Sequence, residues 1–250
     1  MLRGFYTAAN AIVHEQRIIN VKTNNLSNVG TAGFKSDTAI PTTFAEKMLL
    51  IQNRSDTGVI RYRTLQETFT NLEQGTWEET GSRLDMALRG SVFFNIARAS
   101  DGEVLLTRNG QFNIDAEGYL ALGSSGRVLD AAGNEIMLGT ADFTVSEEGV
   151  ITVSDGREIA LGLTYVDEYD DVYKVADSLM RPMNGEVMGN IPPDYEYVVM
   201  QGAYERSNVN VAREMTEVMS AQSVISASAN ALKVANALNQ TAANELMKIN

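Results

Sequence analysis

The stretch Val209–Ile249, VNVAREMTEVMSAQSVISASANALKVANALNQTAANELMKI, decides the fold. It contains neither proline nor glycine, and alanine, which has the highest helix propensity, recurs throughout. One long helix of roughly 60 Å is therefore predicted at about 1.5 Å per residue. Steps of three and four residues select a heptad seam in which large and small residues alternate. This seam consists of Val218, Ala221, Ile225, Ser228, Leu232, Ala235, Asn239, Ala242, Leu246 and Ile249.

A second, shorter heptad begins at the N-terminus, where the same spacing predicts a helix that pairs with the C-terminal one in coiled-coil fashion. Its seam consists of Leu2, Phe5, Ala9, Ile12, Gln16, Ile19, Thr23 and Leu26. At roughly 37 Å this helix would leave about a third of the C-terminal seam unmatched. We expect the surplus to contact a neighbouring molecule. A pair of isolated helices is marginal in water, so we also expect the termini to be frayed in the monomer and to order on assembly.

Small residues in the C-terminal heptad bear on the kind of assembly. Ala227, Ala229 and Ala231 lie beside the seam and allow close packing on more than one side of the helix. The pattern therefore favours a tube of several helices over a simple pair. Asn239 occupies a position for a large residue, where it either fixes the register of packing or lies at a solvated helix end.

The middle of the chain reads as an antiparallel β-rich domain. Strands are predicted from alternating patterns, with Gly-containing turns such as Asn109-Gly110 and Glu117-Gly118 at short intervals between them. The fold class is α+β, and the expected domains are 1–35 (helix and Asn/Gly-rich turn), 36–203 (β-rich middle) and 204–250 (long helix). Expected elements of the middle are a helix over Thr42–Gln52 and strands over Val59–Thr64, Gln66–Leu72, Leu84–Leu88, Ser91–Ile96, Val104–Thr107, Ile159–Val166 and Tyr197–Ala203.

Composition limits the function classes. The 250 residues carry a net charge of −12 and no cysteine, so disulfides and thiolate metal sites are not expected. The net charge is +3 for residues 1–35 and 0 for residues 204–250. Because the total is −12, residues 36–203 must carry a net charge of −15. A nucleic-acid partner is therefore not expected. The sequence contains no run of eighteen apolar residues, so membrane insertion is not expected. Glu15 and Arg17 lie too close to the N-terminus to leave room for the apolar region of a cleaved leader, so no such leader is expected.

Residues with possible site chemistry have plainer interpretations. His14, the single histidine, is expected to be an exposed or boundary helix residue, not a catalytic base. Asp167–Asp171 lacks the spacing of a calcium loop and is expected to be a solvated turn. Gly123–Arg127 is expected to connect a hairpin, because no helix follows it to bind phosphate. Trp77 is expected in the core or in a subunit contact, and no cofactor, metal or catalytic residue is predicted.

Three motifs in order resemble those of the bacterial flagellar rod and hook proteins. The first comprises Asn24, Asn25, Leu26, Asn28, Gly33 and Phe34, followed by Lys35. The second comprises Phe93, Phe94, Arg108, Asn109 and Gly110, followed by Asp115–Leu120. The third precedes the last helix and comprises Glu205, Arg206, Ser207, Asn208, Val209 and Asn210. The chain departs from the family pattern at Gly90-Ser91-Val92-Phe93, where a second Gly often stands.

The resemblance implies a structural subunit of the flagellar basal-body rod, of the proximal or distal rod class. Such a subunit polymerises with its own copies and with neighbouring rod and hook proteins into the shaft that transmits torque. It is implied to lie outside the cytoplasm, in the periplasm and cell-wall zone, after passing the flagellar export apparatus without a cleaved signal. The alternative is a cell-wall hydrolase that uses paired carboxylates among Glu78, Glu79 and Asp85.

Overall fold

A computed structural model describes residues 2–39, 68–166, 172–176, 178–182 and 191–247, without the side chains of residues 2–7 and 242–247. The chain divides into two compact units. The helical unit contains helices α1 (Leu2–Ser27) and α3 (Val211–Met247) with strand β1 (Asp37–Ala39). The β unit contains the loop 28–36 and residues 70–209. An N-terminal helix, a β-rich middle and a C-terminal helix therefore follow one another along the chain, as predicted.

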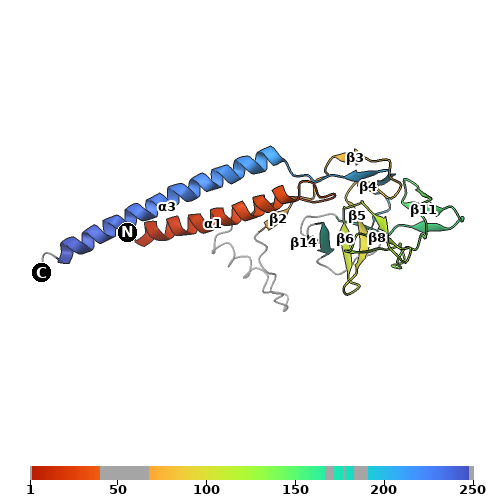
Figure 1. Ribbon diagram of the computed structural model, residues 1–250, viewed down its shortest axis with the longest axis horizontal. Coiled ribbons are helices and arrows are strands. Elements are labelled where there is room, and N and C mark those ends of the chain that lie inside the picture. Colours follow the sequence, from red (N-terminus) through yellow and green to blue (C-terminus); the bar gives the residue numbers. More distant parts are fainter. Residues whose placement is uncertain (1, 40–67, 167–171, 177, 183–190, 248–250) are drawn as a thin grey trace. The chain divides into compact units, whose positions relative to one another are not determined.

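In the helical unit, α1 and α3 lie side by side (Figure 1). They run antiparallel, because Asn25 contacts Glu214 while Lys22, earlier in α1, reaches Glu217, which is later in α3. The two helices contain 26 and 37 residues, so α3 is 11 residues longer. Strand β1 forms a two-stranded sheet with β2 (Thr68–Thr70), which lies within the predicted strand Gln66–Leu72.

Burial along α3 follows one face. Of the predicted seam residues, Ala221 is buried, and the half-buried ones are Val218, Ile225, Ser228, Leu232 and Ala235. Asn239 is exposed, and the side chains of Ala242, Leu246 and Ile249 lie outside the described part. On α1, the half-buried seam residues are Ala9, Ile12, Ile19 and Leu26, whereas Gln16 and Thr23 are exposed. Coiled-coil packing between these faces stays a prediction.

The β unit is built on a sheet whose eight strands, within the described residues, are antiparallel. Its order is β14-β15-β6-β5-β9-β8-β7, with β13 also paired to β5. The bounds are β5 Val92–Arg98, β6 Val104–Thr107, β7 Asn113–Ile114, β8 Leu120–Leu122, β9 Gly126–Val128, β13 Leu163–Tyr165, β14 Val172–Ala176 and β15 Leu179–Pro182. The predicted antiparallel architecture is confirmed, and short hairpins such as β5–β6, β8–β9 and β14–β15 join strands that follow one another in sequence.

Smaller sheets complete the β unit. Strand β4 (Met86–Arg89) pairs with β16 (Val198–Gln201), and β3 (Trp77–Glu79) pairs with β17 (Ala203–Glu205). A third sheet contains β10 (Phe143–Val145), β11 (Val150–Val153) and β12 (Glu158–Ala160). The main core collects the inward-facing apolar side chains, in which the rings of Phe94 and Phe112 meet edge to face at 5.0 Å.

Two predicted strands are wrong in extent, because the chain changes sheets within each. Ile159–Val166 is divided, since β12 pairs with β11 whereas β13 pairs with β5. Tyr197–Ala203 is also divided, since β16 pairs with β4 whereas β17 pairs with β3. The predicted helix Thr42–Gln52 and strand Val59–Thr64 lie outside the described residues. No described helix is both long and apolar enough to cross a membrane.

Candidate structural site at the motif residues

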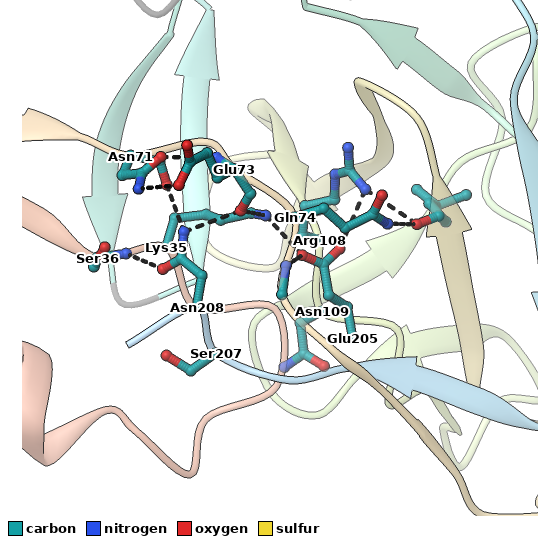
Figure 2. Close-up of polar contacts among 12 residues, drawn as sticks. Lys35, Ser36, Asn71, Glu73, Gln74, Arg108, Asn109, Glu205, Ser207 and Asn208 are labelled. Atoms are coloured by element: carbon teal, nitrogen blue, oxygen red, sulfur yellow. Dashed lines mark hydrogen bonds and ion pairs between the residues drawn. The ribbon is translucent and has the colours of Figure 1, made fainter. Parts of the chain in front are cut away.

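Parts of all three motifs meet inside the β unit, at a polar cluster that Figure 2 shows. The loop 28–36 supplies Lys35, the segment after β6 supplies Arg108, and the end of β17 supplies Glu205. We call these three residues the junction cluster. Each is almost completely buried, and Lys35 and Glu205 are separated by 170 residues in sequence.

Glu205 is the centre of the junction cluster, and its side chain is 1% exposed. Its Oε1 accepts hydrogen bonds from Lys35 Nζ at 2.7 Å and from the Gly75 backbone N–H at 2.8 Å. Its Oε2 accepts one from Arg108 Nη1 at 3.2 Å. One buried carboxylate therefore balances two buried cations, and a buried charge of this kind is tolerated only when it is paired.

Both cations have further acceptors, and Arg108 also has an aromatic neighbour. Lys35 Nζ donates to the Glu73 carbonyl at 2.7 Å, and Arg108 donates to the carbonyls of Leu88 and Gly90 while its guanidinium lies 4.7 Å from the centre of the Phe93 ring. Burial lowers the pKa of Lys35 to about 8, against the opposing attraction of Glu205. Burial therefore outweighs the ion pair at Lys35.

Asn208 joins the segment before α3 to two other segments of the β unit (Figure 2). Its side-chain oxygen accepts from the Ser36 N–H at 2.8 Å. Its amide nitrogen donates to the carbonyls of Asn71 at 2.9 Å and Glu73 at 3.0 Å. Without Asn208 these backbone groups would need water as hydrogen-bond partners. The Asn208 side chain therefore links the segments by hydrogen bonds, as a neighbouring strand would in a sheet.

Two motif glycines permit close approach of backbones around this site. A Cβ atom on Gly33, whose φ is +64°, would lie 2.3 Å from the carbonyl carbon of Arg108. A Cβ atom on Gly110 would lie 1.6 Å from the carbonyl oxygen of Met86, whose N–H donates to the Gly110 carbonyl at 2.9 Å. Side chains at either position would push these segments apart.

A second buried polar cluster lies in the helical unit, and we call it the helix cluster. It comprises Lys22 and Asn25 on α1 with Glu214 and Glu217 on α3. Lys22 Nζ lies 3.2 Å from Glu214 and 2.6 Å from Glu217. Asn25 donates to Glu214 at 2.9 Å, and its amide also bonds both the N–H and the carbonyl of Asp37. Lys22 holds the pKa of Glu217 below its ordinary value by hydrogen bonding.

The remaining motif residues serve local structure. Asn28 accepts from the Thr31 hydroxyl at 3.1 Å in the loop after α1, and Asn210 accepts from the Arg213 N–H at 3.1 Å, which caps α3. Asn109 and Ser207 accept from backbone N–H groups two residues later. The buried motif aromatics are Phe34, Phe93 and Phe94, whereas Asn24 is exposed and Leu26 and Val209 are half-buried.

Sequence reasoning named Arg108 as a motif residue but missed the other charged members of both clusters as site residues. Lys35 and Glu205 stood in the motifs but were given no role, and Lys22, Glu214 and Glu217 were not singled out. Single charged residues in helices and loops are usually solvated, so the residue type alone does not indicate that such a side chain is buried. A usable signal is present at Lys22, because three and four residues separate it from the seam positions Ile19 and Leu26.

The residues considered for chemistry were His14, the carboxylates near β3, Gly123–Arg127 and Asp167–Asp171. His14 is partly exposed, with Nδ1 3.7 Å from Glu15. Glu78 and Glu79 lie exposed on β3, beside Trp77, which is 43% exposed and so is not a core residue. Gly123–Arg127 connects the β8–β9 hairpin as predicted, Asp167–Asp171 lies outside the described part, and the described residues contain no group of metal ligands.

Comparison with known proteins gives two family matches. Residues 87–163 match the flagellar hook protein FlgE/F/G D1 domain, and residues 200–246 match the flagellar basal body rod FlgEFG protein C-terminal domain. The chain is 30% identical over 228 residues to the flagellar basal-body rod protein FlgF of Rhizobium meliloti, covering 88% of this chain and 87% of that one.

Two further relatives match along nearly their whole length. The FlgF protein of Caulobacter vibrioides is 29% identical over 244 residues, which cover 94% of each chain. The flagellar basal-body rod protein FlgG of Borreliella burgdorferi is 28% identical over 267 aligned positions, which cover 95% of this chain and 99% of that one.

Proposed function

Because this chain belongs to the family of bacterial flagellar basal-body rod proteins, we propose that it polymerises through its terminal helices into the shaft that transmits torque to the hook. The chain is a structural subunit of the basal-body rod, not an enzyme, and it assembles with other flagellar rod and hook proteins. Nothing supports the cell-wall hydrolase alternative.

The observation that carries this proposal is the surface of α3. From Val218 to Asn244 the only charged residue is Lys233. Large apolar side chains are exposed on this helix at Val211, Met215, Met219, Val224, Val234 and Leu238. A helix that faced water on its outer side would carry charges there, whereas a helix with apolar residues around it is normally buried. In the rod, copies of the chain and neighbouring rod proteins would cover this surface.

The junction cluster has a mechanical part in the same proposal. The loop 28–36 follows α1 directly, and Glu205–Val209 leads directly into α3. Lys35, Glu205 and Asn208 bind these two segments into the β unit. Force applied along either helix therefore reaches the β unit through the buried polar contacts. A network of this kind resists small displacements better than an apolar contact, because its hydrogen bonds are directional.

Location and partners extend the proposal. The subunit belongs to the flagellar basal body. We place it in the periplasm and cell-wall zone, where the rod must pass, and we infer export by the flagellar apparatus without a cleaved signal. Coiled-coil packing of α1 on α3, self-association and ordering of the termini on assembly complete the mechanism. The acidic β unit would lie outside a tube of interlocked helices, in contact with its neighbours.

The test replaces Ile225, a half-buried residue of α3, with aspartate. A charge in a packed helix contact is severely unfavourable. We expect cells whose only copy carries Ile225→Asp to lose swimming, while the β unit of the purified chain keeps its urea midpoint. Thr152→Asp, at an exposed position of β11, is the matched control and should leave swimming unchanged. Normal swimming with Ile225→Asp would refute the proposal.

A further inference from the structure

The heptad seam of α3 does not determine by itself where α1 sits along it. A slip of seven residues puts Ile225 at the place of Val218 and Ser228 at the place of Ala221. Each exchange replaces one side chain with another of similar size, although serine adds a hydroxyl group. Apolar packing of this kind discriminates weakly between registers one heptad apart. Because α3 is the longer helix by 11 residues, it has room for such a slip.

The helix cluster is not repeated along α3. Glu214 and Glu217 are the acidic residues that face Lys22, and the Lys22 and Glu214 side chains are only 7% and 8% exposed. The next charged residue of α3 after Glu217 is Lys233, which is exposed. A slip of one heptad would move Lys22 opposite the uncharged stretch that begins at Val218. The ammonium group would then be buried without a carboxylate, which is strongly unfavourable.

We propose that the helix cluster sets the register of α1 on α3. The seam would allow several alignments, but only one of them pairs Lys22 with Glu214 and Glu217. The inference rests on the pairing of α1 with α3 that the proposed function invokes. Buried polar groups in paired helices have this role elsewhere, at some cost in stability. Asn25 extends the alignment, because one amide bonds Glu214 of α3 and the backbone of Asp37 in β1.

The consequence concerns partner choice in the rod. Every copy presents the same seam, so a neighbour's α1 could pair with any exposed stretch of α3. An α1 that docks on the charge-free part of α3 must bury Lys22 without a partner, whereas its own α3 supplies Glu214 and Glu217. The helix cluster therefore favours the correct pairing through the cost of the wrong ones.

Disulfide trapping reads the register directly, because the chain has no cysteine of its own. Counting from Lys22 opposite Glu214 and Glu217 in an antiparallel pair, Ala9 lies opposite the turn that contains Ser228. A slip of one heptad brings Ala235 opposite Ala9 instead. Ala9→Cys combined with Ser228→Cys therefore reports the native register, and Ala9→Cys combined with Ala235→Cys reports the slipped one. All three positions carry small, half-buried residues, which limits disturbance.

The full-length chain is oxidised under mild conditions at a concentration at which it self-associates, because the termini are proposed to order on assembly. The ratio of native to slipped product within single chains is then measured. We expect the native product to dominate. In the neutralised variant Lys22→Met, Glu214→Gln, Glu217→Gln, we expect the ratio to fall by about tenfold or more. Lys22→Arg keeps the charge and should keep the ratio. Lys233→Met removes an exposed charge of the same sign and should also keep it.

A merely stabilising role gives a different pattern. Removal of the cluster would then lower both products in parallel and leave their ratio unchanged, which would overturn the inference. The absence of the native product in the chain with an intact cluster would overturn it too. Failure of the proposed function is separable, because it appears as normal swimming with Ile225→Asp and not in the trapping ratio.

Discussion

Glu205→Gln is the perturbation that most clearly separates the members of the junction cluster. Glutamine keeps the shape of the side chain but removes the charge that balances Lys35 and Arg108. It also places an NH2 group where one of three donors now approaches an oxygen. Breaking a buried ion pair from one side costs about 3 to 5 kcal/mol, so we expect a loss of about 4 kcal/mol in the free energy of unfolding.

Lys35→Met, the matched variant, should behave differently. Glu205 would keep Arg108 and the Gly75 N–H as partners. The lowered pKa of about 8, against an ordinary 10.5, means that the protein disfavours the charged form of Lys35 by roughly 3 kcal/mol. Methionine of similar length avoids that cost, although the Glu73 carbonyl loses a donor. We therefore expect a loss below about 1 kcal/mol, or a gain.

Urea unfolding of the full-length chain measures both variants, followed by fluorescence of the single tryptophan. Trp77 lies in the β unit directly opposite Glu205 in the β3–β17 ladder, so its signal reports the unit that contains the junction. A loss for Glu205→Gln of less than about 1 kcal/mol would refute the reasoning. An equally large loss of unfolding free energy for Lys35→Met would also refute it. The Lys35 charge would then matter to stability as much as the Glu205 charge, contrary to the reasoning.

Three further predictions concern the same unit. Between pH 8 and 10.5 the unfolded state binds a proton at Lys35 that the folded state has lost, so stability should rise with pH across this window in the wild type relative to Lys35→Met, as urea midpoints would record. Gly33→Ala should destabilise by more than about 2 kcal/mol in thermal melts, whereas Gly30→Ala in the same loop, with nothing within 4 Å, should change little. Asn208→Ala removes three side-chain hydrogen bonds, and calorimetry should show a loss of about 3 kcal/mol.

The architecture could be predicted because it depends on local pattern. Period-two alternation and glycine turns specify short antiparallel strands, and alanine-rich heptads specify helices. The sheet to which each strand belongs was harder to predict. The divisions within Ile159–Val166 and Tyr197–Ala203 depend on which strand, elsewhere in the sequence, pairs with each half. The domain boundaries at 35/36 and 203/204 and the subunit interface remain predictions.

The polar clusters could not be predicted from residue types alone. Lys35 and Glu205 are 170 residues apart, and neither has a sequence neighbour that marks it as buried. Motif resemblance pointed to the segments that meet at the junction cluster, but it assigned no contacts within them. The glycines of the motifs are understood only with the structure, since Gly33 and Gly110 are required by backbone segments distant in sequence.

The central claim is that the terminal helices hold the subunit in the rod. The most direct measurement counts this chain in basal bodies purified from cells whose only copy carries Leu232→Asp, with cellular levels measured in parallel. Leu232 is a half-buried residue of α3. We predict that the variant accumulates in cells with a folded β unit but is absent from basal bodies. Incorporation at the wild-type number of copies would contradict the account.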